Sequence, residues 1–216
     1  SVRRVLELKK RTGLFRQRTV PLDQVMEAVG TAEHQAIARD VTARSLVLVR
    51  DSGSVVTSLR TGPQPVSLLA YADDPANTLG STLAGVLRAG GYTVTMFRLW
   101  PSSGPASLDS ARAALAASPT VVVAASIRVS AWSGTISMPP HVAELVNATA
   151  LAKPTVLVSF GSPYLLSQVP AVQGYLLAWA ARPMNEMAVG AALTGRGDIS
   201  GRLPIPLNDG LPIGTG

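Results

Sequence analysis

The sequence has no cysteine, few charged residues and few aromatic ones. The absence of cysteine among its 216 residues excludes a disulfide framework and a thiolate metal site, and it leaves the redox compartment undetermined. Charged residues make up 15% of the chain and hydrophobic residues 47%, which argues against intrinsic disorder, because disorder requires low hydrophobicity and high charge. The chain must therefore bury much of its length, as one large domain or as a domain with an appendage.

Acidic and basic residues balance everywhere except at the start of the chain. The formal net charge of +6 suggests nucleic acid or an anionic surface as a partner. Residues 1–18, however, hold seven basic residues and one acid, whereas residues 19–216 hold twelve of each sign. A body without net charge and with only ten aromatic residues gives little support to nucleic-acid binding. We expect no nucleic-acid partner.

The longest run without charge, residues 154–181, is long enough to span a bilayer. Three prolines and two glycines interrupt it, a pattern typical of buried strands joined by turns. The N-terminus carries charges with no apolar segment behind them, so it does not have the pattern of a signal peptide. We expect no membrane span.

Short apolar strands alternate with helices along most of the chain. A helix is expected at residues 2–11, and another from Ala32 to about Arg44, with Thr31 as its N-cap. The strands expected after it are residues 45–50, 66–72, 92–99, 120–127, 155–160 and 173–179. The further helices expected are residues 77–89, 108–117, 139–151 and 185–193. Apolar strands separated by helices predict an α/β fold, a doubly wound α/β/α sandwich with a mostly parallel sheet of five or six strands.

The usual signatures of a catalytic or metal site are missing or lie in the wrong context. His34 and His141 lack the spacing of a zinc site, and no G-x-S-x-G nucleophile elbow occurs. Residues 161–163 follow a strand but are expected to form a turn, because proline ends them. Residues 51–54 (DSGS) also follow a strand, but we expect no helix to open after them, so they lack the context of a phosphate-binding loop. We expect neither a metal nor a cofactor.

Polar side chains directly after strands are the remaining candidates for a site. Asp51, Asp73 and Asp74 each follow a strand, and doubly wound sheets bind ligands at the carboxyl edge of their strands. The exit of the fourth strand brings a cation, Arg128, and an aromatic ring, Trp132, to the same edge. Such an edge is suited to binding a polar ligand, but the fourth strand's exit supplies no general acid.

Several short motifs occur in an order and at spacings that point to one family. In the first half these are KRTGLF (residues 10–15), an EH pair at a helix start (33–34) and SLVLV (45–49). In the second half they are KPTV (153–156), GSPY (161–164), LAW (177–179) and SGRLP (200–204). Each string alone is weak. In this order, across nearly the whole chain, they resemble the C-terminal domain of glycoside hydrolase family 3 enzymes, while residues 60–130 agree in layout only.

The resemblance implies that a catalytic barrel precedes this domain and carries the aspartate nucleophile. Residues 1–30 would then be the end of the barrel domain plus a linker, and residues 31–216 the C-terminal α/β sandwich. Many β-glucosidase members of the family carry the acid/base glutamate on the loop after the strand that matches residues 120–127. This chain has AWSGT (residues 131–135) there and no glutamate. That departure favours the β-N-acetylhexosaminidase branch, whose acid/base is a His/Asp pair on a barrel loop.

Retaining hydrolysis needs two catalytic groups about 5 Å apart, and this chain is expected to supply neither. The resemblance therefore predicts a non-catalytic domain of a β-N-acetylglucosaminidase-type enzyme that packs on the barrel, shapes the sugar site and is inactive alone. Its partners would be the barrel and a carbohydrate substrate. The candidates for the rim of the substrate site are Arg128, Trp132, Asp73 and Asp74. The alternative is a stand-alone flavodoxin-like domain that binds a nucleotide or flavin, against which the missing phosphate loop argues.

Overall fold

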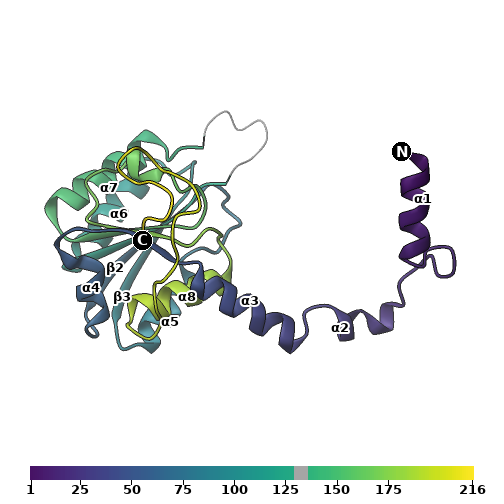
Figure 1. Cartoon of the computed structure of the whole chain (residues 1–216). Helices are drawn as coiled ribbons and strands as arrows, with labels where there is room; N and C mark the ends of the chain where they lie inside the picture. The colour runs from purple at the N-terminus through teal and green to yellow at the C-terminus, as the bar shows by residue number, and fades with distance from the viewer. Residues whose placement is uncertain (129–135) are drawn as a thin grey trace. The chain divides into compact units, whose positions relative to one another are not determined.

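The computed structural model describes residues 1–128 and 136–216 (Figure 1). The chain divides into two compact units, Ser1–Arg39 and Asp40–Gly216. The first unit contains α1 (Val2–Arg11), the 3-10 turn η1 (Leu22–Gln24), α2 (Val25–Ala28) and most of α3 (Ala32–Arg44). No residue of this unit is buried, so it has no core of its own.

The second unit is built on a sheet whose strands, among the described residues, number six. They are β1 (Val47–Asp51), β2 (Pro65–Ala72), β3 (Thr93–Leu99), β4 (Thr120–Ser126), β5 (Thr155–Ser159) and β6 (Gly174–Leu177). Their order in space is β1-β6-β5-β4-β2-β3. The neighbouring strands β6, β5, β4, β2 and β3 pair in parallel, whereas β1 pairs antiparallel with β6. The predicted mostly parallel α/β sheet is confirmed.

Helices cover both faces of this sheet (Figure 1). One face is covered by α4 (Val55–Arg60), α5 (Ser81–Ala89) and α8 (Pro183–Leu193), and the other by α6 (Pro105–Ala116) and α7 (Pro140–Ala152). Successive residues of β4 point to opposite faces, so Val122 and Ala124 pack under α5 and α8 while Val121 and Val123 pack under α6 and α7. Because both faces are covered, β4 is buried along its whole length, which explains its continuous apolar sequence.

Local chemistry explains where most of the helices begin. At α3, the Thr31 hydroxyl accepts the His34 N–H at 3.2 Å, as the predicted N-cap should. The helices α6, α7 and α8 each begin with a proline, which has no N–H to leave unpaired in the first turn. Helix α5 begins later than expected because the Asn77 side chain accepts the Leu79 N–H at 2.9 Å and closes a turn before it.

The structure corrects two expectations for residues 51–54. Because β1 runs antiparallel, Asp51 pairs with Gly174 at the start of β6 and so lies at the amino edge of the parallel strands, not at their carboxyl edge. A helix, α4, also opens directly after this segment. Its first turn is already occupied, because the Asp51 carboxylate accepts the Val56 N–H at 2.8 Å and the Thr57 N–H at 3.1 Å. This helix start is therefore closed to an external phosphate.

The long uncharged run forms buried strands. Residues 154–181 contain β5, the 3-10 turn η3 (Leu165–Ser167) and β6, as the prolines and glycines predict. None of the helices in the described part of the chain combines the length and the apolar character needed to cross a bilayer.

Candidate functional site

The strand order reverses between β2 and β4. From β2 the chain continues to β3 on one side, and from β4 it continues to β5 and β6 on the other. Sheets of this class bind ligands at the carboxyl ends of the strands where the order reverses. A cavity of about 630 Å³ opens at this edge. The loops after β2, β4, β5 and β6 line it through residues 74, 76–78, 126–128, 160–163 and 179–183.

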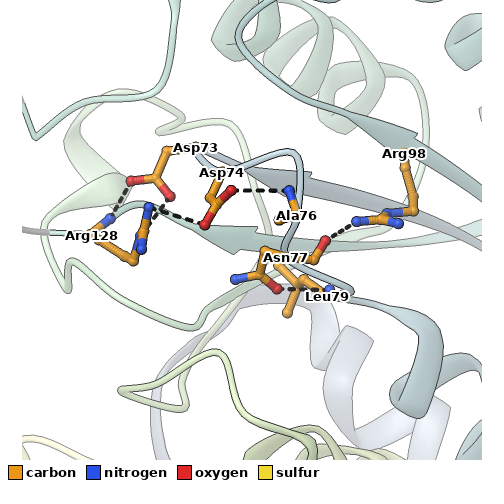
Figure 2. A network of polar contacts seen from close by, with 7 residues as sticks. All are labelled: Asp73, Asp74, Ala76, Asn77, Leu79, Arg98 and Arg128. Carbon is orange, nitrogen blue, oxygen red and sulfur yellow. Dashed lines mark hydrogen bonds and ion pairs between the residues drawn. The ribbon is translucent and has the colours of Figure 1, made fainter.

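Arg128 joins the ends of β2 and β4 (Figure 2). Its backbone N–H donates to Asp73 Oδ2 at 2.9 Å, its Nε donates to Asp73 Oδ1 at 3.2 Å, and its Nη2 lies 3.4 Å from Asp74 Oδ2. Asp74 also accepts the Ala76 N–H at 3.0 Å, which shapes the turn after β2. Since the Arg128 side chain is 55% exposed, each ion pair contributes only about 0–1 kcal/mol of stability. The contacts fix the relative positions of the two strand ends.

Three of the four predicted rim residues therefore come together. Asp73 and Asp74 both contact Arg128, and Asp74 and Arg128 line the cavity. The fourth, Trp132, lies outside the described residues. Next to this group, the Arg98 guanidinium donates to the Asn77 carbonyl (Figure 2), so the loop after β2 is held from both sides.

Sequence reasoning missed the residues that the end of β4 and the exits of β5 and β6 bring to the cavity. Ser126 is the last residue of β4 and is fully buried, and Ser162 is 5% exposed. Arg182 stands directly before α8. All three line the cavity. The signal that could have identified them is their position at or just beyond a strand end, which also identified Asp73. However, the GSPY segment predicts only a turn, and Arg182 has no motif around it.

The start of α5, the helix that follows β2, is filled by the protein's own carboxylate. Nucleotide-binding α/β folds place phosphate at such a helix start. Here Glu186 of α8, 2% exposed, accepts the Gly80 N–H at 3.0 Å and the Leu83 N–H at 2.9 Å. Helix α8 approaches closely because it carries Gly190, where a Cβ would lie 2.5 Å from Val86 of α5. The occupied helix start argues against the nucleotide or flavin alternative.

Burial changes the pKa of two titratable groups near this edge, Tyr71 and Glu186. Burial, with the charge of Asp73, raises the pKa of Tyr71 to about 12, so its phenol stays protonated. Burial also raises the pKa of Glu186, although the N–H groups of α5 and the charge of Arg98 act in the opposite direction. No group of three or more potential metal ligands occurs in the described ranges.

Comparison with known proteins shows that this chain is similar to parts of carbohydrate enzymes. No family model matches the chain. A curated relative, a β-N-acetylglucosaminidase/β-glucosidase from Cellulomonas fimi, is 26% identical over 220 residues, which cover 95% of this chain but 38% of the relative. The resemblance to the C-terminal domain of glycoside hydrolase family 3 enzymes is confirmed. The chain thus spans well under half the length of the curated relative that it matches.

Solved structures of the same class share the fold. The β-glucoside phosphorylase BglX bound to 2FGlc matches with a TM-score of 0.74 at 23% identity, over 96% of this chain and 38% of that one. A glycoside hydrolase family 3 β-N-acetylglucosaminidase from Paenibacillus sp. matches with a TM-score of 0.71 at 22% identity, over 96% of this chain and 39% of that one. In each case this chain corresponds to a part of a much longer chain.

Replacing Glu186 with glutamine tests the buried carboxylate between α8 and α5. Because the pKa of Glu186 is raised in the folded protein, its contribution to stability is present while the carboxyl group is protonated and is lost as the pH rises through the folded-state pKa. We expect the free energy of unfolding of the unsubstituted chain to fall relative to that of Glu186→Gln as the pH rises above 4.5, the ordinary pKa of a glutamate carboxyl group. Urea unfolding followed by circular dichroism measures both.

Glu144→Gln, on an exposed position of α7, is the control and should show no such difference. Glu186→Ala leaves the Gly80 and Leu83 N–H groups buried without an acceptor, and we expect it to lose about 1–3 kcal/mol. A gap between the unsubstituted chain and Glu186→Gln that stays constant or widens in favour of glutamate with rising pH would contradict this account.

Proposed function

We propose that this chain is the non-catalytic C-terminal domain of a family 3 glycoside hydrolase of the β-N-acetylglucosaminidase type, and that it packs on a catalytic barrel. The observation that carries the proposal is the coverage, since the match includes 95% of this chain and 38% of the curated β-N-acetylglucosaminidase/β-glucosidase. The rest of that relative is long enough to hold a separate catalytic domain.

The surface of the first unit supports a packing partner. Seventeen large apolar side chains of the described residues are strongly exposed, and eleven of them lie between Val2 and Ile37. Val2, Val5 and Leu6 form one face of α1 and are 47–69% exposed. Contiguous exposed apolar surface of this kind marks an interaction site. We assign residues 1–30 to the end of the barrel domain plus a linker, and residues 31–216 to the C-terminal domain.

The branch of the family is inferred from a missing residue. The name of the curated relative includes both a β-N-acetylglucosaminidase and a β-glucosidase activity. In the β-glucosidase pattern the loop after β4 carries a glutamate, and residues 128–138 of this chain contain no acid. We therefore favour the β-N-acetylglucosaminidase branch, in which the barrel supplies both catalytic groups.

We also propose that Asp73, Asp74 and Arg128 stand at the rim of the sugar site, with Trp132 as a fourth candidate outside the described residues. The two carboxylates hold one guanidinium at the carboxyl edge of the sheet. Carboxylates and guanidinium groups together offer the acceptors and donors that sugar hydroxyls require. The carbohydrate partner is thus bound in part by this domain, while the chemistry takes place on the barrel.

The 216-residue chain alone is expected to show no hydrolysis of an aryl N-acetyl-β-D-glucosaminide, because retaining hydrolysis needs two groups about 5 Å apart and we place both on the barrel. Release of the aryl alcohol, followed by absorbance, measures this. The full two-domain enzyme serves as the positive control. Turnover that co-purifies with the chain and scales with its concentration would overturn the proposal.

Replacing Val5 and Leu6 with serine should weaken binding of this chain to a separately produced barrel. Burying two such side chains contributes about 1.5–3 kcal/mol each, so we expect at least a tenfold loss of affinity in a titration. The urea midpoint of the chain should stay unchanged, because both side chains are already about half exposed. Leu151→Ser, at an 82% exposed position of α7, is the control. Equal affinity of the double variant and the control would argue against barrel packing through α1.

Asp73→Ala should raise the KM of the two-domain enzyme for the aryl glucosaminide several-fold, because it releases both the backbone and the side chain of Arg128. A change in kcat is not expected, since we place no catalytic group here. Asp109→Ala, which breaks an exposed ion pair with Arg112 on α6, is the matched control. Unchanged kinetics in Asp73→Ala would remove these residues from the sugar site.

A further inference from the structure

The positive charge at the start of the chain is used neither by the core nor by the proposed sugar site. Helix α1 carries five basic residues and one acid, and none of its residues is buried. Residues 19–216 show no such excess, since they hold twelve residues of each sign. A local excess of one sign of charge attracts partners of the opposite sign. The anionic partner that the net charge suggests is therefore expected at α1.

The basic residues of α1 lie largely on the side away from the apolar stripe of residues 2, 5 and 6. Arg4 and Arg11 are seven residues apart, about two turns of helix, so they share one row opposite that stripe. Arg3 and Lys10, also seven residues apart, flank the row on one side. Leu8, four residues from Arg4 and three from Arg11, flanks it on the other side. We call these five side chains the basic face of α1.

Most of the charge on the basic face is available to a partner. Arg3 Nε lies 2.9 Å from Glu7 Oε1, and this exposed ion pair is weak. In the described part of the chain, no acid pairs with the side chains of Arg4, Lys10 and Arg11. All of these side chains are exposed. Four basic residues and the single acid Glu7 leave this side of α1 with three net positive charges.

The turn after α1 adds two cations next to the end of the helix. Gly13 has a φ of 76°, a conformation that glycine adopts readily at helix ends. The Leu14 N–H donates to the Lys9 carbonyl at 3.0 Å, and the Arg16 N–H donates to the Gly13 carbonyl at 2.8 Å. These bonds hold Arg16 close to the last turn of α1, and Arg18 follows it. Both side chains are exposed, so the positive surface continues past the helix.

The exposed leucine within the basic face favours a lipid surface over a nucleic acid. Leu8 is 56% exposed although cations border it. An aliphatic side chain among cations is suited to the boundary between anionic headgroups and acyl chains, where basic amphipathic helices bind. Single-stranded nucleic acid is instead bound by cations interleaved with aromatic side chains, and α1 contains no aromatic residue.

We propose that the basic face of α1 binds the surface of an anionic lipid bilayer, so that the protein lies against a membrane without spanning it. The cations contact lipid phosphates, and Leu8 enters the headgroup boundary. Clusters of four to eight basic residues on an amphipathic helix bind anionic lipid, with about fivefold in affinity for each residue near the surface. The apolar stripe lies on the other side of α1, so barrel packing and lipid binding use different faces of the helix.

The test is co-sedimentation of the 216-residue chain with two kinds of vesicle. One kind contains equal parts of phosphatidylglycerol and phosphatidylcholine, and the other contains phosphatidylcholine alone. We expect the anionic vesicles to bind the chain about a hundredfold more tightly, because at least three cations act on them. Raising sodium chloride from about 0.1 M to about 1 M should release the chain, since the Debye length falls from about 10 Å to about 3 Å. Equal binding to both vesicles, or binding that resists salt, would overturn the proposal.

Variants of the basic face separate its local arrangement from net charge. Arg4→Gln with Arg11→Gln should lower the affinity for anionic vesicles about 25-fold, fivefold for each cation. Helicity should be kept, because glutamine and arginine have similar helix propensity. Arg39→Gln with Arg112→Gln removes the same charge from exposed positions on α3 and α6 and is the matched control. Leu8→Ser should lower the affinity for anionic vesicles several-fold without changing the affinity for double-stranded DNA.

Equal effects of the two double-arginine variants would show that net charge, not the basic face, binds the vesicles, and would overturn the proposal. DNA that binds as tightly as the anionic vesicles, together with no effect of Leu8→Ser on vesicle binding, would overturn the lipid assignment. The Val5→Ser, Leu6→Ser variant should bind anionic vesicles as the unsubstituted chain does, because its substitutions lie on the apolar stripe. Loss of vesicle binding in that variant would assign the contact to the stripe and contradict the proposal. Barrel packing is tested separately, because its titration contains no lipid.

Discussion

The burial of the central parallel strands on both faces is the constraint from which the other features of the second unit follow. Apolar side chains alternate to both sides of β4, so helices must cover both sides, and a chain that returns over the sheet after each strand makes those strands parallel. Once both faces are covered, the strand ends are the part of the sheet left for binding. The reversal of strand order then selects the carboxyl ends of β2 and β4, where Asp73 and Arg128 meet.

This dependence explains how much of the fold and of the candidate site could be predicted from the sequence. The periodicity of apolar residues and the positions of proline and glycine predict the strands and most helices. Buried strands appear as continuous apolar runs, and proline or glycine marks their boundaries. They also place Asp73, Asp74 and Arg128 at one edge. The direction of β1 was not predictable, because a five-residue strand reads the same in either direction, and Asp51 was therefore expected at the wrong edge. Helix α4 was missed because its six residues are too few to show a helical period.

The contacts at the start of α5 and around the cavity could not be predicted from the sequence, for a different reason. Glu186 fills the start of α5 from more than a hundred residues away, and the pairing depends on Gly190 allowing α8 to approach Val86. A glycine and a glutamate four residues apart on a helix give no local signal of such a contact. Arg182 and Ser126 are likewise ordinary in sequence, and only the convergence of four loops on one cavity relates them.

Two carboxylates at helix starts distinguish this domain from the nucleotide-binding members of its fold class. Nucleotide-binding sheets leave helix N-termini open to phosphate, whereas here Asp51 occupies α4 and Glu186 occupies α5. Each carboxylate satisfies N–H groups that would otherwise bind an external anion, so stability and nucleotide binding are alternative uses of the same donors. In this domain the N–H donors at both helix starts stabilise the fold. The loops at the carboxyl edge of the sheet remain available for recognition, and they are where we place the proposed sugar site.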